Sequence, residues 1–273
     1  MSRKKIFGQC KLCGMSGQLS FEHVPPKAAF NNGKFHYQST LDEIHKLEET
    51  ELDFSHPSKY PTTRLRKKQG GVGYYSLCEK CNNDTGRWYA KDFIDWSVQT
   101  MTILLKTNGK PTLYYPTRFY PLRIIKQVLT MFYSVCMEGM DKKEPELQKF
   151  LLNKQERFLS KRYRVYCYYN LKGSMRYLAD NFISEGNSSL ITHASELSFA
   201  PFGFVFTINS APSDKRLFDI SHFAGFEYNH WNEFYHRFQV LPTYLPHSPL
   251  DYRTKDEVVS AIMSNRNAKI EDQ

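Results

Sequence analysis

The sequence lacks any long apolar run. No segment of the 273-residue chain reaches the roughly 18 consecutive apolar residues that a membrane helix needs. The first residues are positively charged, but no apolar stretch follows them, so the pattern of a secretory signal is missing. Internal repeats and low-complexity tracts are also missing. These absences predict a globular cytoplasmic protein that does not contact a membrane.

Acidic residues are outnumbered by basic ones. The chain has 28 Asp and Glu against 37 Lys and Arg, which leaves a formal net charge of +9. A basic balance favours a polyanionic partner such as nucleic acid, although a merely basic globular protein would have the same charge. Aromatic residues reach 15%, and their rings serve both hydrophobic cores and base stacking.

Cysteine is scarce but patterned. Four of the six cysteines form two C-x-x-C pairs, namely Cys10, Cys13, Cys78 and Cys81. Disulfides are not expected in a reducing compartment. Two C-x-x-C turns instead supply four thiolates for one tetrahedral ion, which predicts a structural zinc site. Cys136 and Cys167 lie in apolar surroundings and are predicted to be core residues.

The first hundred residues are predicted to form, in order, a C-x-x-C turn (a knuckle), a strand, an insertion, a second knuckle and a helix. A turn follows the first cysteine pair, and residues 19–24 alternate as in a short strand that Pro25 and Pro26 end. Residues 31–60, with an acidic stretch at 42–53 that allows a short helix, look like an insertion. After the second pair, residues 82–85 suit a helix N-cap. Three aromatic residues then share one helical face: Tyr89, Phe93 and Trp96.

The remaining residues have a different pattern. Residues 112–121 are rich in Pro and Tyr and are predicted to be a linker, after which Pro121 opens an apolar helix. A shorter helix is expected through 147–151, strands at 165–169, 202–208 and 234–241, and a closing helix at 255–273. We therefore expect an α+β protein with domains at 1–108 and 109–273, the second containing a helical segment and a mixed or antiparallel sheet.

The order of motifs in the first hundred residues is specific. A C-x-x-C pair is followed by Glu22-His23 at a strand end before Pro25, and then by a second C-x-x-C pair with Asn82 directly after it. This order resembles the four-cysteine, zinc-stapled branch of the HNH endonucleases, also called ββα-metal or His-Me finger nucleases. The resemblance covers residues 7–100, about a third of the chain. No family is identified for residues 110–273.

The resemblance implies a role for each matching residue. His23 would be the general base that takes a proton from water, and an imidazole suits that role near neutral pH. Glu22 and Asn82 would hold a catalytic Mg²⁺ or Mn²⁺, since carboxylate and amide oxygens are hard ligands. Asn83 is an alternative ligand, and Asn82 has a competing role as an N-cap. Outside such a motif, a Glu-His pair on a strand is usually a pair of surface residues without a catalytic role.

A further residue of the family pattern is a middle Asn or His that orients the base. Asn31 and Asn32 are both candidates, and the sequence does not decide between them.

Basic residues gather near the second cysteine pair. A nucleic-acid backbone needs such a positively charged strip, although a solvated loop has the same composition. The residues predicted to contact phosphate are Lys27, Arg64, Arg66, Lys67, Lys68 and Arg87.

The sequence thus predicts a metal-dependent HNH endonuclease that hydrolyses phosphodiester bonds, with DNA favoured over RNA. A setting in bacterial antiviral defence is suggested by the resemblance alone. The alternative is a non-catalytic zinc-knuckle protein that binds nucleic acid, and a second is a structural protein dominated by its C-terminal part. Residues 109–273 are expected to recognise substrate, sense a signal, or bind a partner protein or a second copy.

Overall fold

The computed structural model describes residues 5–38, 66–107, 115–135, 144–171, 175–184, 191–212, 214–236 and 238–241. The chain forms two compact units, one of residues 1–32 with 72–244 and the other of residues 33–71 with 245–273. Most of the predicted insertion, the acidic stretch within it, the closing helix, Arg64 and Cys136 lie outside the described residues.

The described residues of the second unit form a hairpin. Strand β3 (Phe35–Gln38) pairs antiparallel with β4 (Arg66–Gln69), and Phe35 lies opposite Gln69. The backbone N–H of Gly70 donates to the carbonyl of Lys34 at 2.8 Å. Gly70 has a φ of 80°, a conformation that glycine adopts without strain.

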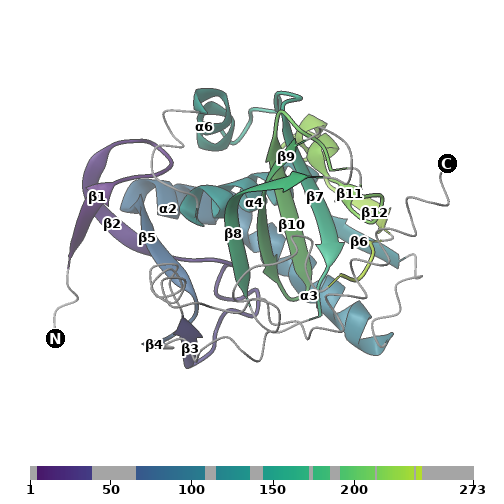
Figure 1. Ribbon diagram of the computed structural model, residues 1–273, viewed down its shortest axis with the longest axis horizontal. Coiled ribbons are helices and arrows are strands. Elements are labelled where there is room, and N and C mark those ends of the chain that lie inside the picture. Colours follow the sequence, from purple (N-terminus) through teal and green to yellow (C-terminus); the bar gives the residue numbers. More distant parts are fainter. Residues whose placement is uncertain are drawn as a thin grey trace. The chain divides into compact units, whose positions relative to one another are not determined.

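The first unit begins with a three-stranded antiparallel sheet (Figure 1). Its order is β1 (Ile6–Gln9), β2 (Ser16–His23) and β5 (Gly73–Cys78). The predicted strand at 19–24 is therefore confirmed, and it ends before Pro25 because proline has no N–H to donate. Both expected knuckles adjoin this sheet, one in the β1–β2 turn and the other at the end of β5.

Three helical segments follow β5 without a break: α2 (Glu79–Thr85), the π-helix η2 (Gly86–Ala90) and α3 (Lys91–Lys106). The N-cap is Cys78, so the predicted cap at 82–85 is wrong, and Asn82 lies within the helix. The helix begins earlier than predicted because its first turn carries the second cysteine pair. Tyr89, Phe93 and Trp96 are all buried, as their spacing predicts.

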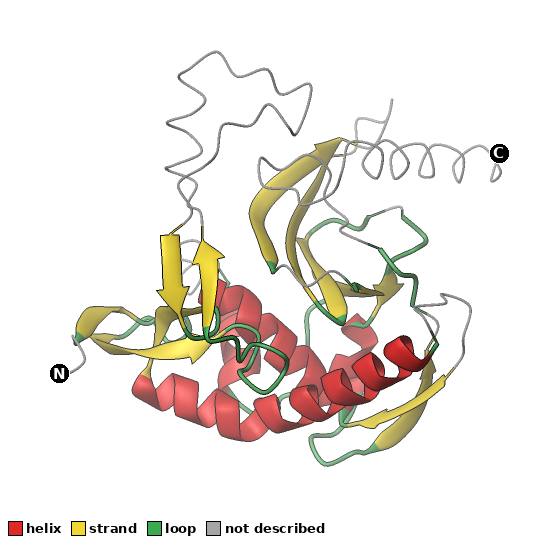
Figure 2. Ribbon diagram, turned by 90° about the horizontal axis from the view of Figure 1, so that it is seen from below, coloured by secondary structure: helices red, strands yellow, loops and turns green. Residues whose placement is uncertain are grey.

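The first unit also contains a five-stranded antiparallel sheet. Its order is β11 (Phe218–Asp219), β7 (Tyr163–Tyr169), β10 (Phe202–Ile208), β9 (Ile191–Phe199) and β8 (Arg176–Ser184). The fold is α+β with antiparallel sheets, as predicted. Figure 2 shows helices of this unit along one side of the five-stranded sheet.

Two further α-helices, a short 3-10 helix and a small sheet complete this unit. They are α4 (Pro121–Val135), α6 (Pro145–Leu152), the 3-10 helix η3 (Ser221–Gly225), and the paired strands β6 (Tyr115–Phe119) and β12 (Asn232–His236). Both helices were predicted. The predicted linker at 112–121 is wrong in part, because residues 115–119 pair with β12. No helix in the described part of the chain has both the length and the apolar character to cross a membrane.

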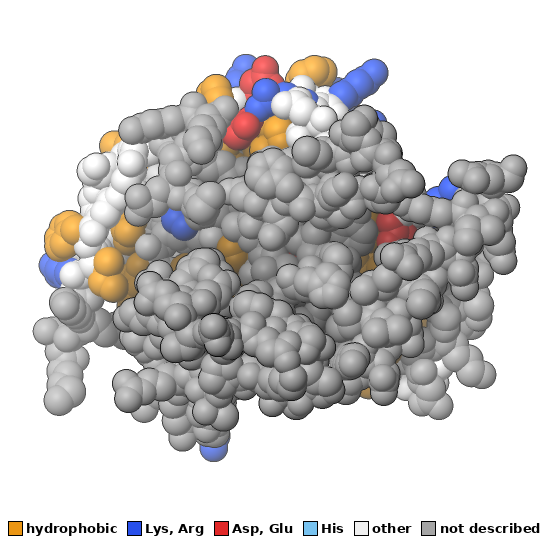
Figure 3. Space-filling view, in the orientation of Figure 1, with side chains coloured by type: hydrophobic (Ala, Val, Ile, Leu, Met, Phe, Trp, Pro, Cys, Tyr) orange, Lys and Arg blue, Asp and Glu red, His pale blue; other side chains and the backbone are white. Residues whose placement is uncertain are grey.

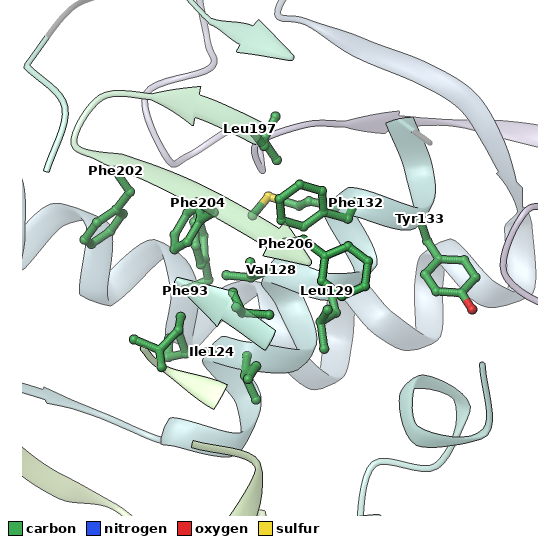
Figure 4. Close-up of a cluster of buried hydrophobic side chains, with 14 of the residues drawn as sticks. Phe93, Ile124, Val128, Leu129, Phe132, Tyr133, Leu197, Phe202, Phe204 and Phe206 are labelled. Atoms are coloured by element: carbon green, nitrogen blue, oxygen red, sulfur yellow. The ribbon is translucent and has the colours of Figure 1, made fainter. Parts of the chain in front are cut away.

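Helix α4 runs through the hydrophobic core. Its residues are buried on every side, and Figure 4 shows Val128, Leu129 and Phe132 facing Phe204 and Phe206 of β10. Helix α3 shares this core. Residues 72–244 therefore belong to one compact unit, and the predicted domain boundary at 108/109 falls inside it.

Candidate metal centre and active site

The four paired cysteines form a cluster that is able to hold a metal ion such as zinc. Their sulfur atoms all lie within 4.8 Å of one another. Cys13 Sγ and Cys78 Sγ are 3.9 Å apart, and a tetrahedron of Zn–S bonds near 2.3 Å separates sulfurs by about 3.8 Å. The donor set and its spacing therefore fit zinc.

The backbone fixes the first knuckle in place. Gly14 N–H donates to the Cys10 carbonyl at 2.8 Å, and the φ of 73° at Gly14 turns the chain back toward β2. Lys11 N–H donates to the carbonyl of Ser76 in β5, also at 2.8 Å. The two knuckles are thus connected by a backbone hydrogen bond as well as by their sulfurs.

The thiols lie so close together that they shift one another's pKa values. A hydrogen bond from the Cys81 thiol lowers the pKa of Cys10 to about 4, and the same contact raises the pKa of Cys81. Burial raises the pKa of Cys13. Four thiolates this close repel one another unless a cation lies among them, so the cluster favours metal binding.

His23 ends β2 with its imidazole half-buried. Burial lowers its pKa, and the positive charge of Lys27 lowers it further. The ring meets the ring of Phe21 edge-on, with centroids 4.9 Å apart. A half-exposed imidazole with a lowered pKa is neutral at neutral pH, which is the form that accepts a proton.

Glu22 points the other way, into the protein. It is 7% exposed, and the hydroxyl of Ser134 in α4 donates a hydrogen bond to its carboxylate. Burial raises the pKa of Glu22 to about 8. A carboxyl group so placed does not fit an open Mg²⁺ or Mn²⁺ site, because it faces Ser134 instead of solvent. Its role as a metal ligand stays a prediction.

Asn82 connects α2 to the strand that carries the histidine. Its amide nitrogen donates to Ser20 Oγ at 3.0 Å and to the carbonyl of Phe21 at 3.2 Å. Among the described residues, its amide oxygen accepts no hydrogen bond. The N-cap role is excluded because Cys78 is the cap. Asn83, the alternative ligand, is exposed.

Asn31, one of two candidates for the middle residue, braces the loop after His23. Its amide nitrogen donates to the carbonyls of Pro25 and Val72, and its amide oxygen accepts from Val72 N–H, each at 2.7 Å. The side chain is buried, whereas Asn32 is exposed. Asn31 therefore ties residues 25–31 to the start of β5, which the sequence alone did not establish.

Gly73 lies opposite His23 in the β2–β5 ladder. A Cβ at this position would come within 2.2 Å of the Glu22 carbonyl and within 2.7 Å of the Phe21 ring. Glycine is therefore required for β5 to approach β2 this closely beside the histidine.

The predicted phosphate contacts are only partly described. Lys27 is exposed and its charge acts on His23, while Arg87 pairs with Asp84 at 2.9 Å. Arg66, Lys67 and Lys68 belong to β4, and their side chains lie outside the described part, as does Arg64. The basic strip stays a prediction.

Comparisons of the chain with known protein families, with characterised proteins and with solved structures found no match.

Proposed function

We propose that this protein is a zinc-stapled HNH-type endonuclease that hydrolyses phosphodiester bonds in nucleic acid, with His23 as general base. The observation that carries the proposal is the β2–β5–α2 arrangement around the four-cysteine cluster, with His23 at the strand end. That order of strand, strand and helix is the one implied by the resemblance to the family. Zinc here has a structural role, because four sulfur ligands leave no open position.

The residues around His23 support a base held in place. Asn82 donates to the carbonyl of Phe21, two residues before His23, and Asn31 holds the loop that follows His23. In this proposal His23 accepts a proton from the attacking water, and Lys27 attracts the phosphate.

A divalent cation is also part of the proposal. Mg²⁺ or Mn²⁺ would supply a positive charge to polarise the phosphate. Asn82 offers an amide oxygen, with Asn83 as the alternative ligand, whereas Glu22 would first have to leave Ser134. DNA is favoured over RNA as substrate, and a cytoplasmic role in antiviral defence belongs to the same proposal.

Plasmid cleavage tests the proposal. Wild type is expected to nick DNA with Mg²⁺ or Mn²⁺ but not with EDTA, and His23→Ala is expected to lose about 10²–10⁴-fold in rate. His230→Ala is the matched control, since His230 is exposed and lies outside the proposed site. If wild type and both variants bind DNA with equal affinity and none cuts DNA or RNA, the protein is a non-catalytic zinc-knuckle binder instead.

Residues 109–273 are proposed to recognise substrate, sense a signal, or bind a partner or a second copy. A protein without salt-sensitive affinity for nucleic acid would be a structural protein, contrary to this proposal.

A further inference from the structure

Two aromatic side chains face solvent side by side next to His23. Phe21 on β2 and Tyr75 on β5 are paired in the ladder and are 38% and 41% exposed. Their ring centroids are 5.3 Å apart, at an interplanar angle of 64°. In Figure 3, exposed hydrophobic side chains are visible in the region of β1 and β2. Exposed aromatic rings that lie together often mark a binding surface.

The pair is held in place by its neighbours. The ring of Phe21 meets His23 at 4.9 Å, and it lies so close to Gly73 that a Cβ there would come within 2.7 Å of it. The absence of a side chain at Gly73 therefore permits the position of Phe21. The ring is thereby fixed between the proposed base and Tyr75.

The charge and the rings next to His23 indicate which kind of ligand would bind to Phe21 and Tyr75. An anionic group beside His23 is attracted by Lys27, whose charge already acts on the imidazole. A phosphodiester placed there carries its nucleoside toward the neighbouring rings. A flat aromatic ring binds the face of a nucleobase, and that face is accessible only when the base is unpaired. A duplex keeps its base faces stacked inside the helix, so it cannot use the two rings.

We propose that Phe21 and Tyr75 form a stacking platform for an unpaired base, and that the preferred substrate is single-stranded or locally opened nucleic acid. This inference rests on the proposed function, because it takes the reacting phosphate to lie at His23.

Binding by the His23→Ala protein tests the platform. Fluorescence anisotropy is measured with a short labelled single strand and with its blunt duplex, in DNA and in RNA. The single strand is expected to bind more tightly. Replacing both rings, Phe21→Leu with Tyr75→Leu, keeps apolar volume but removes the stacking faces. This change is expected to weaken single-strand binding about tenfold or more and to leave duplex binding within about twofold.

Two further variants separate stacking from folding. Phe21→Tyr keeps a ring and is expected to retain single-strand affinity. Phe7→Ala is the matched control, because Phe7 is 70% exposed on the same sheet but lies opposite Gln18, about 17 Å along the strand from His23. Thermal melting of each variant checks that the sheet is intact. Equal loss of single-strand and duplex binding in the leucine variant, or no loss of either, would overturn the platform.

Cleavage of the same oligonucleotides distinguishes the two proposals. If wild type cuts single strands and duplexes equally and the leucine changes have no effect on cleavage, the nuclease proposal stands and the platform proposal is wrong. If wild type cuts neither substrate but the leucine changes still remove single-strand binding, the platform proposal stands and the nuclease proposal is wrong.

Discussion

The three-stranded sheet and the five-stranded sheet of the first unit are stabilised differently. The larger sheet packs a continuous set of buried rings against α3 and α4, with Trp96 stacked on Phe202 at 4.0 Å. The smaller sheet buries few large side chains and leaves Phe7, Phe21 and Tyr75 exposed. It also carries the cysteine cluster, and hydrogen bonds from the side chains of Asn31 and Asn82 reach its backbone.

This difference fits the proposed function, which needs both a stable core and an open site. A hydrophobic core must exclude water, whereas an active site must admit a substrate. In the proposal, a metal ion in the four-cysteine cluster would hold these strands together without covering their faces, so that β2 could present His23 and Phe21 to solvent.

The largest expected effect is the loss of the cluster. Wild type is expected to contain one zinc per chain, and Cys78→Ala is expected to lose it, because three thiolates bind the ion far less tightly. Structural zinc contributes about 10–16 kcal/mol of apparent binding free energy in small peptides, so hydrogen exchange in β1 and β2 should accelerate strongly. Metal analysis and exchange mass spectrometry measure both effects.

Cys167→Ala is the control for this change, since Cys167 is buried in β7 away from the cluster. Its zinc content should equal that of wild type. Retention of zinc by Cys78→Ala would show that the two knuckles do not share an ion.

The second change weakens the large core and leaves the cluster intact. Phe202→Ala removes a fully buried ring and is expected to lower the free energy of unfolding by about 3–5 kcal/mol, with zinc content unchanged. Phe158→Ala, where the side chain is 78% exposed, should change it by less than about 0.5 kcal/mol. Urea unfolding measures both, and similar losses in the two variants would contradict the comparison.

The third change removes the brace behind His23. Asn31→Ala breaks three hydrogen bonds of 2.7 Å and is expected to cost about 1–3 kcal/mol for each buried group left without a partner. Cleavage should slow because the loop after the base loses its anchor. Asn32→Ala, at an exposed neighbour, should keep wild-type stability and rate. Equal rates for the two variants would remove Asn31 from the site.

The fourth change concerns the dependence of stability on pH. Burial lowers the pKa of Lys126 in α4 from its ordinary 10.5 to about 7, against a weaker opposing effect of Glu156. Between about pH 7 and 10.5 the unfolded chain therefore holds a proton that the folded chain releases, so this group makes folding more stable as pH rises. Lys126→Met should flatten that rise in a thermal melting series.

Lys91→Met is the control for the pH series, because the Lys91 side chain is 80% exposed and paired with Asp95. It should keep the wild-type slope. An unchanged slope in Lys126→Met would mean that Lys126 is not the titrating group.

Local sequence predicted the elements that carry an unbroken apolar run or a proline at a helix start. The apolar run at 202–208 matches β10 in both bounds, and Pro121 does begin α4. Strands β8 and β9 were not predicted, because Ser195 and Glu196 interrupt the apolar pattern yet are buried in the sheet.

The site shows the same limit. The C-x-x-C spacing predicted the cluster, because both pairs lie in local turns. The burial of Glu22 depends on Ser134, which is 112 residues away in the sequence, so no local pattern reveals it. The burial of Asn31, in contrast to the exposed Asn32, likewise involves a distant contact, the hydrogen bond from Val72 N–H.

The most direct test of the account is the single-turnover cleavage rate of zinc-loaded protein, compared between wild type and His23→Ala at equal zinc content and equal melting temperature. The account predicts a rate at least about 100-fold lower for the variant, because the proton acceptor for water is gone. Equal rates in the two proteins would contradict it.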